Sequence, residues 1–514
     1  MALCSHRTKF IRLGSHINNF VRFSSCQGFS GKGLVLGVHT TENNEVKLTP
    51  AAEKYNELCE GKLLQQIQLT GNDIKPGKCV LFWGLDKEFN SVAVAGLGKD
   101  SEPTDDDIEL ICNKSEAIRI AAAAGCRALD SAGIKNIHVE DFGDADAAAQ
   151  GSALSVWKFQ EYKTDKKPLA NVELSQLSRD QTNWRKGITK AEAQNLARKL
   201  TDTPANLLDP TVFSEEAKRL LSPLGVDVKI YDKKWAEDQK MFSFLAVAQG
   251  SAQPPKFLEI TYNPADSKQP PAALVGKGVT FDAGGISLKP SASMDEMRGD
   301  MGGAAVVIGT VFGLAKLGVP ANLKVLVPLV ENLPSGTAIK PGDVIRARNG
   351  KTICVDNTDA EGRLILADAL SYSGDFKPKW VLDIATLTGA MRVALGNAAT
   401  GVFANNNKLY EELEEAGRST GDRVWRMPLW KHYTKIMCEH DAYDLNNIGK
   451  GAKGGGSCTA AAFLREFAPK DTPWLHLDIA GVMGPDASAY LQKGMTGRPT
   501  RTIIEFIERE TKTV

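Results

Sequence analysis

The second half of the chain contains a series of apolar runs that end in small or polar residues. The runs are Pro271–Phe281, Asn322–Val330, Lys351–Asn357, Trp380–Leu387 and Trp474–Val482. Runs of this kind are typical of strands buried on both faces of a sheet. Helical patterns lie between them, which predicts a parallel or mixed sheet covered on both sides. Binding sites in such sheets lie beyond the carboxyl ends of the strands. Most of these runs have Gly, Asp, Asn or Thr at or just past that end.

The first part of the chain has the same alternating pattern. We expect strands at Gly33–His39, Lys78–Leu85, Ser91–Gly98 and Asn136–Phe142, and an Ala-rich helix at Glu109–Ala132. A chain of 514 residues is long enough for more than one domain. The fold class is therefore predicted as α/β with two domains, each a mixed, mostly parallel sheet flanked by helices. The expected boundaries are 31–185 for the N-terminal domain, 186–205 for a linking helix after a polar stretch, and 206–514 for the larger C-terminal domain.

Residues 1–30 differ in composition from the rest. They carry Arg7, Lys9, Arg12 and Arg22, several serines and no acidic residue. Phe10, Leu13, Ile17 and Phe20 recur at helical spacing. This pattern is typical of a mitochondrial transit peptide and predicts a mitochondrial location. The alternative is a basic tail on a cytoplasmic protein.

Composition excludes several classes of function. Lys and Arg number 62, as do Asp and Glu, so there is no general attraction to nucleic acid or to an anionic membrane. Nine scattered cysteines without a CxxC pair indicate neither a disulfide framework nor a thiolate zinc site. The motif GxGxxG occurs only after a polar segment, and GxSxG is absent. With seven histidines and no HExxH, a metal site has to be built largely from carboxylates.

The octet NTDAEGRL, 357–364, has a structural and a functional interpretation. Thr358 and Glu361 have the spacing of a capping box at the start of a buried helix. Asp359 and Glu361 are also candidate metal ligands. We expect Thr358 to cap the helix and the Glu361 carboxylate to be used for metal binding.

A second acidic cluster lies in the glycine-rich segment VGKGVTFDAGGISLKPSASMDEMRGDMGGAA, 275–305. Asp282 and Asp300, together with Asp359 and Glu361, are expected at or near strand ends of one sheet domain. Four like charges in a partly buried cleft need a compensating cation, and two divalent metals would supply it. Taken singly, each residue could instead serve as a turn, a cap or a surface residue. Oxygen ligands suit Zn, Mn, Mg or Co, so the metal stays open.

At these residues the chain resembles the leucyl aminopeptidases of the cytosol aminopeptidase family. NTDAEGRL stands here as that family's signature, and the segment 275–305 matches its other metal-binding segment. The resemblance continues through SCTAAAFLREF and HLDIAGVM toward the C-terminus. It implies a two-domain hydrolase with the metal site in the C-terminal domain, which removes N-terminal residues from peptides, normally as a homohexamer.

The resemblance also implies roles for individual residues. One metal would be held by Asp282, Asp359 and Glu361, and the second by Lys277, Asp282, Asp300 and Glu361. Lys277 would bind as a neutral amine, Lys289 would stabilise the oxyanion, and Arg363 would hold a bicarbonate that acts as general base. The substrate-binding residues would be Met297, Asn357, Thr386, Leu387, Gly389, Ala480 and Met483. Their apolar walls would favour Leu and Met at the substrate's N-terminus.

Alternatives to this function remain. The chain could be a catalytically silent structural relative, a dipeptidase acting on substrates such as Cys-Gly, or a DNA-binding regulator. The intact metal residues argue against the first, and the zero net charge argues against the last. One departure is Phe242, where members of the family usually carry glycine after a methionine. It lies outside both metal segments and concerns local packing.

Overall fold

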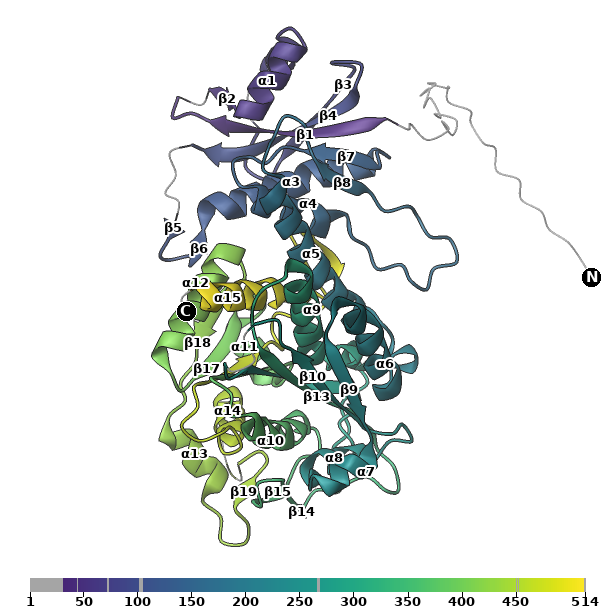
Figure 1. Ribbon diagram of the computed structural model, residues 1–514, viewed down its shortest axis with the longest axis vertical. Helices are drawn as coiled ribbons and strands as arrows, with labels where there is room; N and C mark the ends of the chain where they lie inside the picture. Colours follow the sequence, from purple (N-terminus) through teal and green to yellow (C-terminus); the bar gives the residue numbers. More distant parts are fainter. Residues whose placement is uncertain are drawn as a thin grey trace, which may run out of the picture.

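The computed structural model describes residues 31–43, 45–71, 74–100, 105–265, 269–449, 451 and 453–512. Figure 1 shows two α/β bodies stacked along the long axis, the smaller one in purple and blue. Both contain a mixed, mostly parallel sheet, so the predicted fold class is confirmed. The transit peptide predicted for 1–30 lies outside the described residues.

Six strands form the sheet of the smaller body, in the order β3-β4-β1-β7-β8 with β2 beside β1. Four of them run parallel, and β2 and β3 are antiparallel to their neighbours. Helices α3 and α4 pack on one face, and α1 and α2 on the other. The bounds are β1 (Lys32–Thr40), β2 (Val46–Leu48), α1 (Pro50–Leu58), α2 (Lys62–Leu69), β3 (Cys79–Trp83), β4 (Phe89–Lys99), β5 (Asp105–Asp106), β6 (Ile111–Cys112), α3 (Asn113–Ser131), β7 (Asn136–Val139), α4 (Ala145–Val156) and β8 (Asn171–Leu174).

Nine strands form the larger sheet, in the order β18-β17-β20-β16-β11-β13-β10-β9 with β12 beside β13. The central strands β20, β16, β11 and β13 run parallel, as expected from their continuous apolar runs. Antiparallel pairing begins toward the edges, at β17 and at β10. The bounds are β9 (Asp227–Tyr231), β10 (Lys256–Tyr262), β11 (Ala272–Gly276), β12 (Gly278–Asp282), β13 (Leu323–Asn332), β16 (Val381–Ala385), β17 (Thr400–Ala404), β18 (Val424–Arg426) and β20 (Trp474–Asp478).

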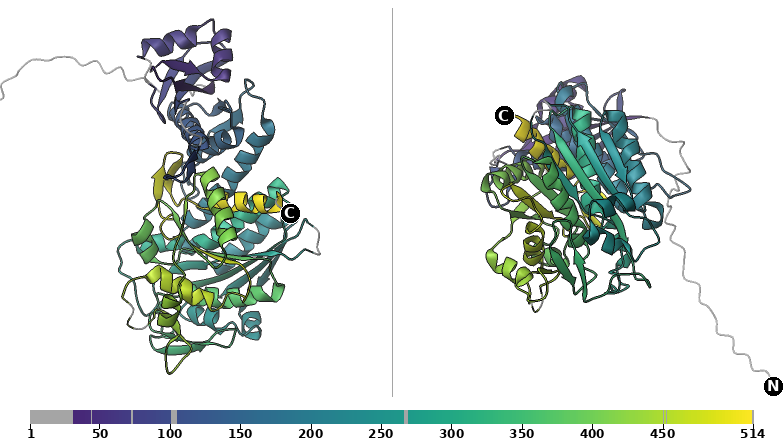
Figure 2. Two further views of the ribbon diagram at one scale, coloured as in Figure 1. Left: turned by 90° about the vertical axis from the view of Figure 1, so that its left-hand side faces the viewer. Right: turned by 60° about the horizontal axis from the view of Figure 1, so that its bottom comes forward.

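Helices cover both faces of the larger sheet, as the two views in Figure 2 show. One apolar core joins the sheet to α5, α6, α9, α12 and α15, and a second joins it to α8, α10 and α14. The bounds are α5 (Gln181–Asp202), α6 (Pro210–Leu221), α7 (Lys233–Asp238), α8 (Phe242–Ala248), the 3-10 helix η3 (Met294–Gly299), α9 (Gly302–Leu317), α10 (Gly362–Ser373), α11 (Gly389–Leu395), α12 (Asn407–Thr420), α13 (Lys431–Cys438), α14 (Gly456–Arg465) and α15 (Thr500–Lys512). The stretch Met294–Leu317 is long and apolar enough to span a membrane, but 78% of its most apolar window is buried inside the protein.

Helix α5 runs between the two bodies and is held there by charge pairs. Lys190, on α5, is 1% exposed. Its Nζ lies 3.1 Å from Asp146 Oδ2 on α4 and 2.7 Å from Glu505 Oε2 on α15. Glu508 Oε2, also on α15, lies 3.4 Å from the same Nζ. A buried lysine with three carboxylate partners fixes the relative position of the three helices, because separating them would leave charges buried without a partner.

The polar stretch before the expected linking helix contains β8, which completes the first sheet. Two expectations of local structure are wrong in detail. The helix expected at Glu109–Ala132 starts only at Asn113, because residues 111–112 pair with 105–106 as strand β6. The run Lys351–Asn357 forms β15 (Thr352–Val355), which pairs with β14 (Asp343–Arg346) and β19 (Leu445–Asn446) in a separate small sheet. A further hairpin joins β21 (Asp486–Ser488) to β22 (Leu491–Gly494).

Candidate metal centre

Five side chains that the sequence predicts as metal ligands come together at one end of the larger sheet. Lys277 separates β11 from β12, and Asp282 is the last residue of β12. Asp300 lies between η3 and α9. Asp359 and Glu361 lie in the turn between β15 and α10. Asp359 and Glu361 therefore reach the cluster from the end of β15 in the small sheet, and not from a strand of the larger sheet.

These side chains form a compact, buried cluster. Ligand oxygens of Asp282, Asp359 and Glu361 lie within 4.8 Å of one another. Lys277 Nζ lies 2.7 Å from Asp300 Oδ1 and 2.9 Å from Glu361 Oε1. Asp359 is half-buried and the others are buried. Carboxylates this close together need cations between them.

Two glycines allow the elements to approach this closely. A Cβ on Gly303, in the first turn of α9, would lie 2.0 Å from the backbone oxygen of Ile384 on β16. A Cβ on Gly362 would lie 2.5 Å from Lys277 Cε. Both helices can therefore bring their first turns against the sheet and the Lys277 side chain only because these positions have no side chain.

Lys289 contacts the opposite side of the cluster. Its Nζ lies 2.8 Å from Asp282 Oδ2 and 2.5 Å from Asp359 Oδ1. The Lys289 side chain is 21% exposed, compared with 3% for Lys277. Lys289 is thus the more exposed of the two lysines in the cluster.

Polar side chains that the sequence analysis missed hold the ligands in place. Asn332, at the end of β13, donates from Nδ2 to Asp282 Oδ1 at 2.8 Å and to Thr358 O at 3.1 Å. Thr358 does not cap α10, contrary to the prediction. Its hydroxyl donates to Gly284 O at 2.6 Å and accepts from Ser287 N at 2.8 Å. The Thr358 hydroxyl is therefore hydrogen-bonded to the loop after β12 and does not cap α10.

The cluster shifts the pKa values of its members in opposite directions. Burial, reinforced by the charge of Glu361, raises the pKa of Asp282 to about 7. Burial also raises the pKa of Asp300 well above its ordinary value. Burial acts the same way on Glu361, but the ammonium groups of Lys277 and Lys289 outweigh it and lower that pKa. The charge of the carboxylates is thus only partly balanced by the two lysines.

The donor set fits divalent cations. In the described part of the chain, the buried atom Asp300 Oδ2 has no hydrogen-bond partner. A buried carboxylate oxygen without a donor is costly unless a cation takes that place. Asp282, Asp359 and Glu361 each offer an oxygen to one point, as a metal site requires. Lys277 can join them as a ligand once it has lost its proton beside such cations.

Arg363 lies behind the cluster, in the first turn of α10. It is 7% exposed, and burial lowers its pKa to about 10. Its Nη1 donates to Asn447 O at 2.6 Å, while its Nε has no hydrogen-bond partner among the described residues. Asn447 also donates to Asn357 O at 2.6 Å, so it ties the octet to the end of β19. Asn447 is far from the octet in the sequence, so no motif spacing predicts these contacts.

A cavity of about 220 Å³ contains the cluster and extends from it along apolar side chains. Its lining combines the five predicted ligands and Lys289 with Met297, Thr386, Leu387, Gly389, Ala480 and Met483. Asn357 and Arg363, also predicted for the site, are not part of this lining. Asn357 instead accepts a hydrogen bond from Asp359 N at 2.8 Å and supports that ligand from behind.

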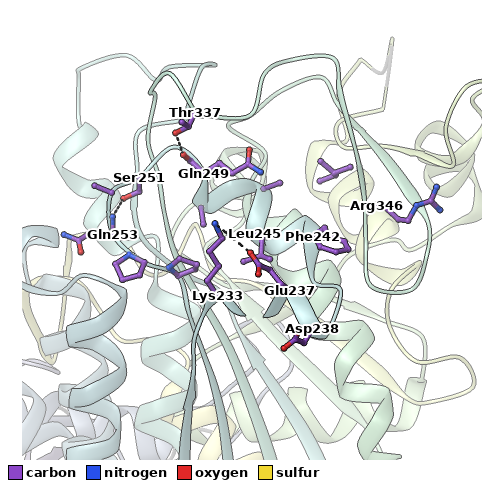
Figure 3. Close-up of a pocket in the computed structure, with 16 residues that line it drawn as sticks. Lys233, Glu237, Asp238, Phe242, Leu245, Gln249, Ser251, Gln253, Thr337 and Arg346 are labelled. Atoms are coloured by element: carbon purple, nitrogen blue, oxygen red, sulfur yellow. Dashed lines mark hydrogen bonds and ion pairs between the residues drawn. The ribbon is translucent and has the colours of Figure 1, made fainter. Parts of the chain in front are cut away.

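A larger cavity of about 1150 Å³ lies elsewhere, along α7 and α8 (Figure 3). Phe242, the departure noted in the sequence, lines it and is 43% exposed. The labelled acids there are Glu237 and Asp238, and Lys233 Nζ lies 4.0 Å from Glu237 Oε1. No metal cluster occurs there within the ranges that the structure describes. The smaller cavity is therefore the candidate active site.

Comparisons with known proteins agree with this site. Residues 195–504 match the family model "Cytosol aminopeptidase family, catalytic domain", and residues 35–166 match the N-terminal domain of the same family. The chain is 52% identical to the cytosol aminopeptidase of Sus scrofa and 51% identical to that of Homo sapiens, in each case over 93% of this chain and 92% of the relative.

Solved structures show the same relationship. A bottromycin maturation enzyme in complex with Mn superposes with a TM-score of 0.81 at 31% identity, over 94% of this chain and all of the other. A mutant of tomato leucine aminopeptidase superposes with a TM-score of 0.78 at 29% identity, over 94% of both chains. Two family models and near-complete coverage of these relatives establish that the chain belongs to the cytosol aminopeptidase family.

Proposed function

We propose that the carboxylate cluster binds two divalent metals and is the active site of an aminopeptidase. As a member of the cytosol aminopeptidase family, the chain is a metal-dependent peptide hydrolase that removes N-terminal residues. The observation that carries the two-metal proposal is the buried cluster in which, within the described residues, Asp300 Oδ2 lacks a partner. The apolar part of the cavity that contains it supplies a place for one side chain.

The ligands divide into two sets. Asp282, Asp359 and Glu361 would hold one metal, and Lys277, Asp282, Asp300 and Glu361 the other. Zinc fits both sets, with Mn, Mg or Co as alternatives at the more exposed one. The metals supply Lewis acidity and activate water. The substrate's free amine would lie beside Asp300, which limits cleavage to the N-terminal residue.

Lys289 and Arg363 would carry the remaining chemistry. The Lys289 ammonium group already lies within 2.8 Å of two ligands, so it can donate to the oxyanion that forms on the scissile carbonyl. Arg363 has an unpaired Nε among the described residues and can hold a small anion. Bicarbonate in this position would accept the proton of the attacking water.

The apolar part of the cavity would select the N-terminal side chain. Met297 and Met483 present flexible thioethers, and Ala480 and Gly389 leave room between them. Burial of a full aliphatic side chain contributes roughly 1.5–3 kcal/mol. We therefore expect Leu and Met to be preferred.

Assembly and location extend the proposal. We propose a homohexamer that acts on peptides without a nucleic-acid or membrane partner, and mass photometry of the purified chain tests the oligomer. The relatives are named cytosol aminopeptidases. The composition of 1–30 favours a mitochondrial location over a cytoplasmic one, and a fluorescent fusion to these residues tests import.

Metal content and leucyl-amide hydrolysis, measured together on three variants, test the site. Lys289→Ala should keep its metals and lose activity, whereas Asp282→Ala should lose both. Added bicarbonate should stimulate the wild type, and Arg363→Ala should keep its metals and show no such stimulation. Unchanged activity of Lys289→Ala would reject its assigned role.

The same samples separate the remaining alternatives. A metal-loaded wild type that leaves leucyl amide intact would be a silent structural relative. Faster turnover of Cys-Gly than of longer peptides would show a dipeptidase instead.

A further inference from the structure

A cavity of about 420 Å³ lies where the smaller body meets the larger one, away from the metal centre. Arg127 of α3 and Lys158, two residues after α4, line it from the smaller body. Lys493 of β22 lines it from the larger body. Among the described residues of this lining, Asp130 is the only acid. Three cations and one carboxylate therefore surround a cavity that both bodies help to form.

The carboxylate of Asp130 already balances two lysines. Lys135 Nζ lies 2.5 Å from Asp130 Oδ1, and Lys158 Nζ lies 2.5 Å from Asp130 Oδ2. Burial acts to raise the pKa of Asp130, but the hydrogen bonds from these two lysines outweigh it and lower that pKa. Asp130 is thus ionised and shared, so the lining as a whole remains cationic.

Another cation lies directly behind the lining. Arg198, on α5, is fully buried, and it donates from Nε to Met495 O at 3.1 Å and from Nη2 to Gln492 O at 2.9 Å. Burial lowers the pKa of Arg198 to about 10, and of its charged neighbours Asp202 raises this pKa while Arg127 lowers it. Burial also lowers the pKa of Arg127. A negative charge in the cavity would therefore stabilise both guanidinium groups.

The walls of the cavity are held in fixed positions. Gln492 Nε2, next to Lys493, donates to Ser155 O at 2.7 Å and ties β22 to α4. Leu491, also on β22, is buried in an apolar cluster with Leu154 of α4 and Ala123 of α3. The backbone of β22 is therefore fixed relative to both helices. The cations face one cavity from elements that are packed together, as a binding site requires.

We propose that this cavity binds a phosphate group, as the free ion or as the ester of a small molecule. One guanidinium and two ammonium groups match the several oxygens and the double negative charge of a phosphate. A carboxylate carries a single charge and would balance the lining less completely. The volume of the cavity leaves room for a small organic group beside the phosphate. The bound anion would join Arg127 and Lys158 to Lys493 and so stabilise the junction between the two bodies.

Equilibrium dialysis of the metal-loaded enzyme against radiolabelled inorganic phosphate, at an ionic strength held constant with NaCl, tests this inference. Arg127→Gln should raise the dissociation constant about tenfold or more, because a half-buried guanidinium donates charge-assisted hydrogen bonds. Lys493→Gln should raise it about two- to fivefold, the effect expected for one exposed ion pair. Lys493→Gln should fold like the wild type because the side chain is exposed, so the test does not depend on Arg127→Gln alone.

The matched control is Lys233→Gln, which removes the same charge from an exposed lysine in the cavity along α7 and α8. Its dissociation constant should equal that of the wild type, and an equal weakening in this control would overturn the inference, because only net charge would then matter. A constant within twofold of the wild type in both Arg127→Gln and Lys493→Gln would also overturn it, since the phosphate would then be bound elsewhere, for example by the catalytic metals.

Competition identifies the source of the phosphate group. Glycerol phosphate that displaces the label at a lower concentration than unlabelled phosphate would support an ester as the ligand, and the reverse order would support the free ion. Neither result depends on peptide hydrolysis, so the inference stands or fails independently of the proposed function.

Discussion

Replacing Asn332 by alanine removes a side-chain amide that holds Asp282 in the carboxylate cluster. Asn332 Nδ2 donates to Asp282 Oδ1 over 2.8 Å and to Thr358 O over 3.1 Å. A hydrogen bond to a charged group contributes about 1.5–3 kcal/mol, and one to a neutral carbonyl about 0.5–1.5 kcal/mol. Asp282 keeps the bond from Gly284 N at 2.9 Å, so its carboxylate is loosened and not released.

The loss should appear mainly as weaker metal binding. Groups that orient a metal ligand typically change metal affinity by about ten- to hundredfold, or about 1.4–2.7 kcal/mol. Isothermal titration of the metal-free protein with Mn²⁺ measures the dissociation constant directly, without depending on turnover. We expect Asn332→Ala to raise this constant by that factor, with full activity restored at saturating metal.

The control is Asn322→Ala, at the residue just before the opposite end of β13. Asn322 is also largely buried and donates to Gln269 O at 3.3 Å, away from the cluster. A dissociation constant for Asn332→Ala within twofold of both the control and the wild type would refute the reasoning. Asp282 would then be held by its remaining contacts alone.

Three further predictions concern stability. Thr358→Val keeps the shape of the side chain but leaves Gly284 O and Ser287 N without their hydroxyl partner. The free energy of unfolding in urea should therefore fall by about 1–3 kcal/mol, and an unchanged midpoint would contradict these contacts. Gly303→Ala places a Cβ 2.0 Å from a backbone oxygen and should cost more than about 4 kcal/mol or prevent folding, whereas Gly336→Ala, with nothing within 4 Å, should melt like the wild type. Burial raises the pKa of Glu140 to about 8, so its stabilising effect is complete below the unfolded pKa of about 4.3 and is lost as the pH rises through about 8. Glu140→Gln should therefore gain stability relative to the wild type between pH 5 and pH 9 in urea unfolding, and parallel curves would show that burial does not raise the pKa of Glu140.

The sequence predicted the strands better than the contacts between distant segments. The central strands were readable because each is a continuous apolar run, and burial on both faces demands such a run. The sequence did not show that β15 belongs to a separate sheet, since its apolar pattern matches that of the strands in the larger sheet. Thr358 was misassigned because a capping box is a local pattern, while Gly284 and Ser287 are brought to it only by the fold.

The same limit applies to the candidate site. The charged ligands stand out because four acids and two lysines lie among glycines in two short segments. Asn332 and Asn447 do not stand out, because a single Asn at a strand end is common and its partners are remote in sequence. Glu296 of η3 and Arg392 of α11 also line the cavity, 3.9 Å apart, and no motif in the sequence predicts that these two elements meet.

The position of Lys190 has a consequence for how the protein is made. Its partner Glu505 is on α15, which follows every strand of both sheets in the chain. Because ribosomes synthesise from the N-terminus and domains fold as they emerge, the smaller sheet and α5 can form while this carboxylate does not yet exist. The junction between the two bodies is therefore completed as one of the last steps of biosynthesis. Ribosome-bound chains that stop before α15 should carry a protease-sensitive junction that the finished chain lacks.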